Sequence, residues 1–149
     1  MLQSQLARAA TPDLASAVAE LSIALGEATT ADQYYRMAEQ IERAAWGNGL
    51  RQPQVLARIL SERPGRTAEA VRLAEEAART RTDIMTMDAL AWAYFRDGQL
   101  AEAKKASVQA LRTGTRNARI RCHAQTIAEA ATSSARAPVA IRQCLEWRP

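Results

Sequence analysis

The stretch that decides the fold spans residues 84–118 and reads IMTMDALAWAYFRDGQLAEAKKASVQALRTGTRNA. Apolar residues recur three or four positions apart on both sides of Asp97 and Gly98, which predicts two helices joined by a tight turn. Gly114 is placed to end the second helix. A hairpin of this length cannot bury both of its apolar faces alone. We therefore expect similar helices before and after it.

The composition of the 149-residue chain favours a single all-α domain over residues 1–149. Good helix formers, Ala above all, are abundant, Gly and Pro are scarce, and continuous β-branched runs are absent from the sequence. No apolar run approaches the roughly 18 residues that a membrane span needs. No secretory signal is visible at the N-terminus. We expect a cytoplasmic protein that does not enter the membrane.

Helix start and stop signals divide the rest of the chain into similar units. Pro12 and Pro53 stand at predicted helix starts, and Thr30 opens a capping-box pattern that ends at Gln33. Short loops make each helix antiparallel to the one before it. We expect about eight helices in four hairpins, with units at roughly residues 12–46, 52–80, 84–114 and 116–148.

Equivalent positions in these units repeat every 33 or 34 residues. Gly98 follows Gly65 by 33 residues and Cys144 follows Ala110 by 34. A helix–turn–helix of this period resembles the tetratricopeptide repeat (TPR). The central unit matches the family's packing and turn positions at Leu90, Tyr94, Gly98, Ala103 and Ala110, and small residues at close helix contacts are expected at Ala70, Ala103, Ala110 and Ala137.

The resemblance also has departures. Four positions of the family pattern carry other residues, namely Met87, Ala91, Ser107 and Thr115. The match covers about residues 50–149 well, whereas residues 14–45 fit as a degenerate first unit. The stretch from Asp88 to Tyr94 also looks like a bacterial subgroup of the family. The resemblance implies an α-solenoid of antiparallel hairpins, wound as a right-handed superhelix, that binds other proteins without catalysis.

In the TPR family the first helices of successive hairpins line a concave groove. The resemblance places in it Val55, Ile59, Asp88, Trp92, Arg96, Arg119, His123 and Thr126. A mixed surface with one large aromatic residue suits an extended peptide or a helix of a protein partner. The alternative is that Trp92 packs against the next inner helix as part of the core. Clamping of a chaperone tail is not expected, because Asp88 and Trp92 replace the family's Lys and Asn.

We find no catalytic, metal or cofactor motif in the sequence. His123 is the only histidine, and it follows Cys122. Adjacent helical residues point about 100° apart, so the pair does not suit one metal ion, and nothing nearby in sequence orients the imidazole. We interpret the pair as a partly buried thiol beside a surface imidazole. Cys122 and Cys144 are too few for a disulfide framework, and we expect reduced thiols; pairing in an oxidising compartment is the alternative.

The charge pattern leaves two interpretations open. Residues 103–128 contain no acid but several basic residues. On the edge formed by the turns between repeats, Arg79, Arg81, Arg112 and Arg116 form either an anion site or a solvated face. Nucleic-acid binding is not expected, since acids are interleaved and the net charge is only +4.

Two function classes follow for the whole chain. The first is a non-catalytic module that holds a protein or peptide partner in the groove and needs no cofactor. The alternative is a structural or oligomerising fragment of a longer array. A last helix over residues 137–147 would leave Ile141, Leu145 and Trp147 partly uncovered, which favours a homodimer through this C-terminal helix.

Overall fold

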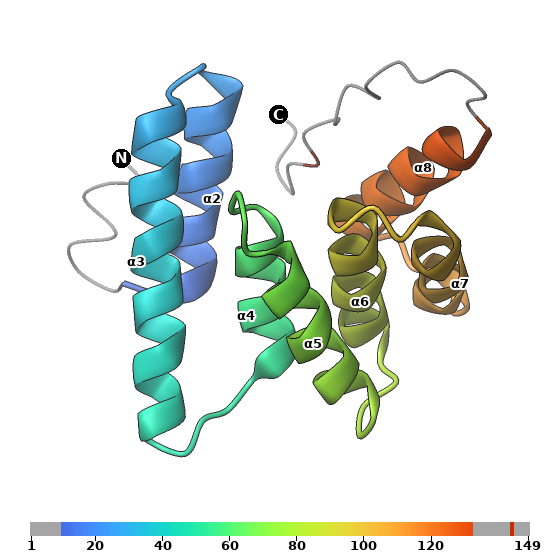
Figure 1. Cartoon of the computed structure of the whole chain (residues 1–149), viewed down its shortest axis with the longest axis horizontal. Helices are drawn as coiled ribbons and strands as arrows, with labels where there is room; N and C mark the ends of the chain where they lie inside the picture. Colours follow the sequence, from blue (N-terminus) through green and yellow to red (C-terminus); the bar gives the residue numbers. More distant parts are fainter. Residues whose placement is uncertain (1–9, 133–143, 145–149) are drawn as a thin grey trace.

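The structure, a computed structural model, describes residues 10–132 and residue 144 (Figure 1). These residues contain seven helices and no strand, which confirms the all-α class. The helices are α2 (Pro12–Ala24), α3 (Ala28–Gly47), α4 (Pro53–Ser61), α5 (Thr67–Ala78), α6 (Ile84–Arg96), α7 (Leu100–Leu111) and α8 (Ala118–Thr132). None of the seven is both long and apolar enough to cross a lipid bilayer.

The described part of the chain forms seven helices, where the sequence predicted about eight for all of it. The expected last helix, over residues 137–147, lies outside the described residues apart from Cys144, which is not helical. The predicted homodimer through that helix, and the predicted close contact of Ala137, also lie outside the described part of the chain.

Side-chain caps and prolines explain where several helices begin. Thr11 Oγ1 accepts a hydrogen bond from the Leu14 amide at the start of α2, and Pro12 is the first helical residue, as predicted. Helix α4 likewise begins at Pro53. Helix α6 is capped by Asp83, whose Oδ1 accepts from the Thr86 amide. These caps and prolines determine which residues form the first turn of each of these helices.

Two predicted starts were wrong. Helix α3 begins at Ala28 rather than at the capping box of Thr30, because the chain turns directly after Gly26 and the Ala31 amide already donates to Glu27. Helix α8 begins after Asn117, whose Oδ1 accepts from the Ile120 amide at 3.1 Å. Thr115, which directly precedes the unit predicted at residues 116–148, accepts from the Asn117 amide instead.

The helices pair into three antiparallel hairpins, α2/α3, α4/α5 and α6/α7, and α8 packs against α6 and α7 (Figure 1). The first helices also lie side by side, because α4 contacts α6 and α6 contacts α8. Small residues of the second helices lie at helix contacts: Ala70 on α5 and Ala103 and Ala110 on α7 are all buried, as predicted. The resulting layer of first helices places the starts of α4, α6 and α8 next to one another.

Candidate binding cleft

A cleft of about 370 Å³ opens where α2, α4, α6 and α8 begin. Its wall includes the second residue of each of these helices, namely Asp13, Gln54, Met85 and Arg119. The first amides of a helix lack carbonyl partners within the helix and carry partial positive charge. The cleft therefore combines four helix starts that come from four distant parts of the sequence.

Three arginine–aspartate pairs surround this cleft. Arg58 on α4 donates from Nη2 to Asp13 on α2. Arg81 donates from Nε to Asp83 at 3.0 Å, and Arg119 Nε on α8 lies 4.0 Å from Asp88 on α6. Side-chain charges of both signs are thus balanced in the wall. The pairs differ in exposure: the Asp13 side chain is 81% exposed, whereas those of Asp88 and Arg119 are buried.

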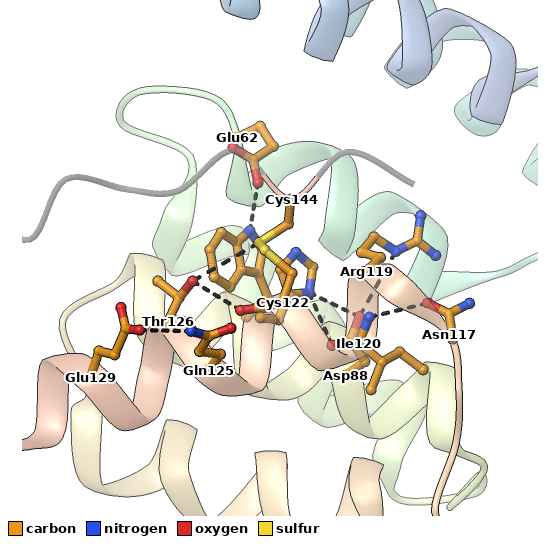
Figure 2. Close-up of a disulfide and its surroundings, with 12 residues drawn as sticks. Glu62, Asp88, Asn117, Arg119, Ile120, Cys122, Gln125, Thr126, Glu129 and Cys144 are labelled. Carbon is orange, nitrogen blue, oxygen red and sulfur yellow. Dashed lines mark hydrogen bonds and ion pairs between the residues drawn. A yellow bond between two sulfur atoms is a disulfide. The ribbon is translucent and has the colours of Figure 1, made fainter. Parts of the chain in front are cut away.

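His123 is buried, so its prediction as a surface imidazole was wrong. Its side chain is 5% exposed, and Nδ1 lies 2.9 and 3.1 Å from the two carboxylate oxygens of Asp88. The ring also stacks on Trp92, with centroids 3.9 Å apart. Asp88 therefore orients His123, although the two residues are 35 positions apart and sequence reasoning found nothing to do so. Figure 2 marks the contacts of Asp88 with α8 as dashed lines.

Trp92 belongs to the core between α6 and α8. It is 2% exposed, and its Nε1 donates to Glu62 Oε1 at 2.5 Å. Glu62 Oε2 also lies 3.5 Å from Arg96 Nη1. These contacts agree with the interpretation of Trp92 as a residue that packs against the next inner helix. Any direct contact of Trp92 with a partner would require it to leave this position.

The two cysteines form a disulfide, so the expectation of reduced thiols was wrong. Cys122 on α8 is bonded to Cys144, 22 residues later (Figure 2). Thr126 lies beside the bond, and its Oγ1 donates to the Cys122 carbonyl at 2.9 Å. A cysteine in a disulfide has no thiol to donate or to attack with, so the Cys122–His123 neighbours do not form a nucleophile pair.

The residues predicted to line the groove lie in three different environments. Val55, Asp88 and Arg119 line the cleft. Ile59, Arg119 and His123 line a smaller adjoining cavity that also contains the buried Tyr35 hydroxyl. Trp92 and Thr126 are buried, and Arg96 is partly buried beside Glu62.

Sequence reasoning missed several cleft residues, chiefly Arg58, Gln54 and Asp13. Arg58 follows Val55 by three positions and so lies on the same helix face, a signal that could have found it. Of the arginines predicted on one edge, only Arg81 lines the cleft. Arg112 instead donates to the carbonyls of Thr82 and Gln109, which holds a turn in place.

Burial raises the pKa of Tyr35 well above its usual value, with added repulsion from Glu62 and Glu20. The hydroxyl therefore stays protonated at neutral pH and can act as a hydrogen-bond donor in the adjoining cavity. No group of three or more His, Cys, Asp or Glu within residues 10–132 and 144 is arranged to hold a metal ion. Comparison with protein-family models found no match, and comparisons with curated proteins and with solved structures found none either.

Proposed function

We propose that this chain is a non-catalytic module that binds a peptide or protein segment in its cleft. The observation that carries the proposal is the cleft itself, with a volume of about 370 Å³ and charges of both signs in its wall. It also presents an apolar contact, since Met85 is 41% exposed at its edge. Ligand sites are concave and combine apolar contacts with a few placed polar groups.

The helix arrangement supports a TPR-like right-handed solenoid as the scaffold of this module. Gly65 and Gly98 are 33 residues apart, and both have a positive φ, of 73° and 82°, in the turn within a hairpin. Because α4, α6 and α8 lie side by side, the first helices form one continuous layer. A repeat of this length with a turn at the same place is typical of the family.

The disulfide bears on where the module works. Disulfides persist in oxidising compartments and are rare in the reducing cytoplasm. The Cys122–Cys144 bond therefore supports an oxidising compartment over the cytoplasmic location that the sequence suggested. Quantifying free thiols in protein taken directly from its source cells tests this, and two free thiols per chain would favour the cytoplasm.

Affinity capture with matched variants tests the binding function. Immobilised parent protein is incubated with lysate of the source cells, alongside Met85→Glu in the cleft and Val108→Glu on α7. Both substitutions put a charge on a partly exposed apolar position, and Val108 is 61% exposed on a helix that does not line the cleft. A partner that binds the parent and Val108→Glu but not Met85→Glu supports the proposal. Identical capture by all three proteins contradicts it.

A further inference from the structure

In the cleft, more N–H donors of Arg58 and Arg81 than aspartate acceptors lack a hydrogen-bond partner among the described contacts. A guanidinium has five N–H donors. Among the described contacts, Arg58 donates through Nη2 to Asp13 and Arg81 donates through Nε to Asp83. Most donors of these two side chains are therefore available to a ligand that brings acceptors.

The acidic groups of the cleft, in contrast, are already engaged. Asp83 accepts from the Thr86 amide at 3.0 Å and from the Thr86 hydroxyl at 2.9 Å, in addition to Arg81. Asp88 is held by His123 at 2.9 Å. The Asp13 side chain is 81% exposed and that of Asp83 is 41% exposed, whereas that of Asp88 is buried. The excess of donors favours a ligand with a negatively charged acceptor, such as a carboxylate or a phosphate.

Charge balance distinguishes these two anions. The wall contains three arginines and three aspartates, so its side chains have no large net charge. The helix starts add partial positive charge, although capping side chains already accept from the first amides of α2, α6 and α8. This modest excess suits one negative charge, whereas the two charges of a phosphate would lie close to three carboxylates. The cleft therefore favours a carboxylate.

Gln54 indicates that the carboxylate belongs to a peptide. Gln54 is 8% exposed and lines the cleft, and its Oε1 is buried without a hydrogen-bond partner. A buried acceptor without a donor is costly, and a ligand N–H would satisfy it. Peptide backbones supply such N–H groups. Val55 and Met85 provide the apolar contact for a neighbouring side chain.

We propose that the cleft binds a short extended peptide segment through an internal Asp or Glu side chain. The carboxylate accepts hydrogen bonds from Arg58 and Arg81, a backbone N–H of the peptide donates to Gln54 Oε1, and an adjacent apolar side chain contacts Met85. The volume is at the small end of the range for ligand sites, about 300–1,000 Å³, so the segment is a few residues long. This inference rests on the binding function proposed above and specifies its ligand.

The test is an NMR titration of the ¹⁵N-labelled full chain with four N-acetylated peptides. They are Ac-Ala-Leu-Glu-Ala-Ala-NH₂, its Gln and phosphoserine counterparts, and Ac-Ala-Leu-Gln-Ala-Ala with a free C-terminal carboxylate. We expect the Glu peptide to shift the amides of Gln54, Met85 and Ala89 and to bind at least fivefold more tightly than each of the others. Equal binding of the Gln peptide, tighter binding of the phosphoserine peptide or of the free carboxylate, shifts elsewhere, or no shifts would each overturn the inference.

Two arginine variants complete the experiment. Arg81→Gln should weaken binding of the Glu peptide at least fivefold. Arg36→Gln is the matched control, because Arg36 is an exposed arginine paired with Asp32 that does not line the cleft, and it should bind like the parent. Equal weakening by both variants would overturn the inference. A captured protein partner that is lost by Met85→Glu but kept by Arg81→Gln would overturn it while leaving the binding function standing.

Discussion

Two groups of arginines in this molecule use the same side chain in opposite ways. In the Glu39 cluster (Glu39, Arg43, Arg63, Arg66 and Glu69), Glu39 accepts from all three arginines, and Glu69 accepts from Arg43 and Arg66. These contacts join α3 to α5 and to the turn after α4. The cleft arginines (Arg58 and Arg81) each donate to one aspartate. The number of acceptors around a guanidinium thus separates an arginine that holds helices together from one that can bind a ligand.

The largest expected effect concerns the disulfide, which joins α8 to residue 144. The chain-entropy estimate for a loop of this length is about 3 kcal/mol. Cys122→Ala combined with Cys144→Ala should lower the free energy of unfolding by that amount, measured by urea denaturation. Reduced parent protein should match the double variant. Equal midpoints for oxidised parent and double variant would show that the disulfide does not stabilise the folded protein.

Removing the central carboxylate of the Glu39 cluster should have the next largest effect. Glu39→Ala leaves Arg63, whose side chain is 14% exposed, with only its 3.6 Å ion pair to Asp32, and should cost about 2 kcal/mol of unfolding free energy. Asp13→Ala, which removes the exposed partner of a cleft arginine, should cost less than about 1 kcal/mol. Chemical denaturation measures both. Equal losses would remove the distinction between the two groups of arginines.

The Glu39 cluster should also make the protein sensitive to acid. Partial burial by itself would raise the pKa of Glu39 and Glu69, but hydrogen bonds from Arg43 and Arg66 outweigh it and hold both values below 4.5. The unfolded chain then binds more protons, so this stabilisation is complete above pH 4.5 and is lost as the pH falls below it. The melting temperature, measured from pH 6 to pH 3, should fall less steeply for Glu39→Gln than for the parent. Parallel curves would contradict this origin of the acid sensitivity.

The smallest expected effect is on the stability of the cleft arginine that we assign to ligand binding. The Arg81 side chain is 53% exposed and its pair with Asp83 is exposed as well. Arg81→Gln should therefore change the free energy of unfolding by less than about 0.5 kcal/mol. Denaturation of the variant measures this directly. A loss above 1 kcal/mol would show that Arg81 stabilises the fold as the arginines of the Glu39 cluster do.

The parts of the fold that depend on neighbours in sequence could be predicted from the sequence. Helix starts at Pro12 and Pro53 are local properties of the chain, and so is the turn at Gly98. The burial of Ala70 and Ala103 followed from helical periodicity combined with the repeat spacing. These signals are short-range, so no tertiary information was needed to interpret them.

The cleft and the polar contacts beneath it could not be predicted in the same way. Whether His123 is buried depends on Asp88, and whether Trp92 has a partner for its indole N–H depends on Glu62, 30 residues earlier. Helical periodicity assigns a face to each residue, but not the partner that it meets. Two cysteines give no indication of pairing by their spacing alone. The repeat spacing identified several positions on the inner face of the first helices. It could not distinguish the buried positions from the accessible ones.

The position of Asp88 has a consequence for the evolution of this chain. Its carboxylate lies within 3.1 Å of His123 and 4.0 Å of Arg119, so one acid contacts two residues of the neighbouring helix. A substitution at Asp88 alone would leave the buried His123 Nδ1 without this hydrogen bond and would remove an ion pair of the buried Arg119. Residues in such direct contact mutate with non-additive effects. In an alignment of descendants of this sequence, positions 88, 119 and 123 should therefore change together, and surface positions such as Arg36 should drift independently.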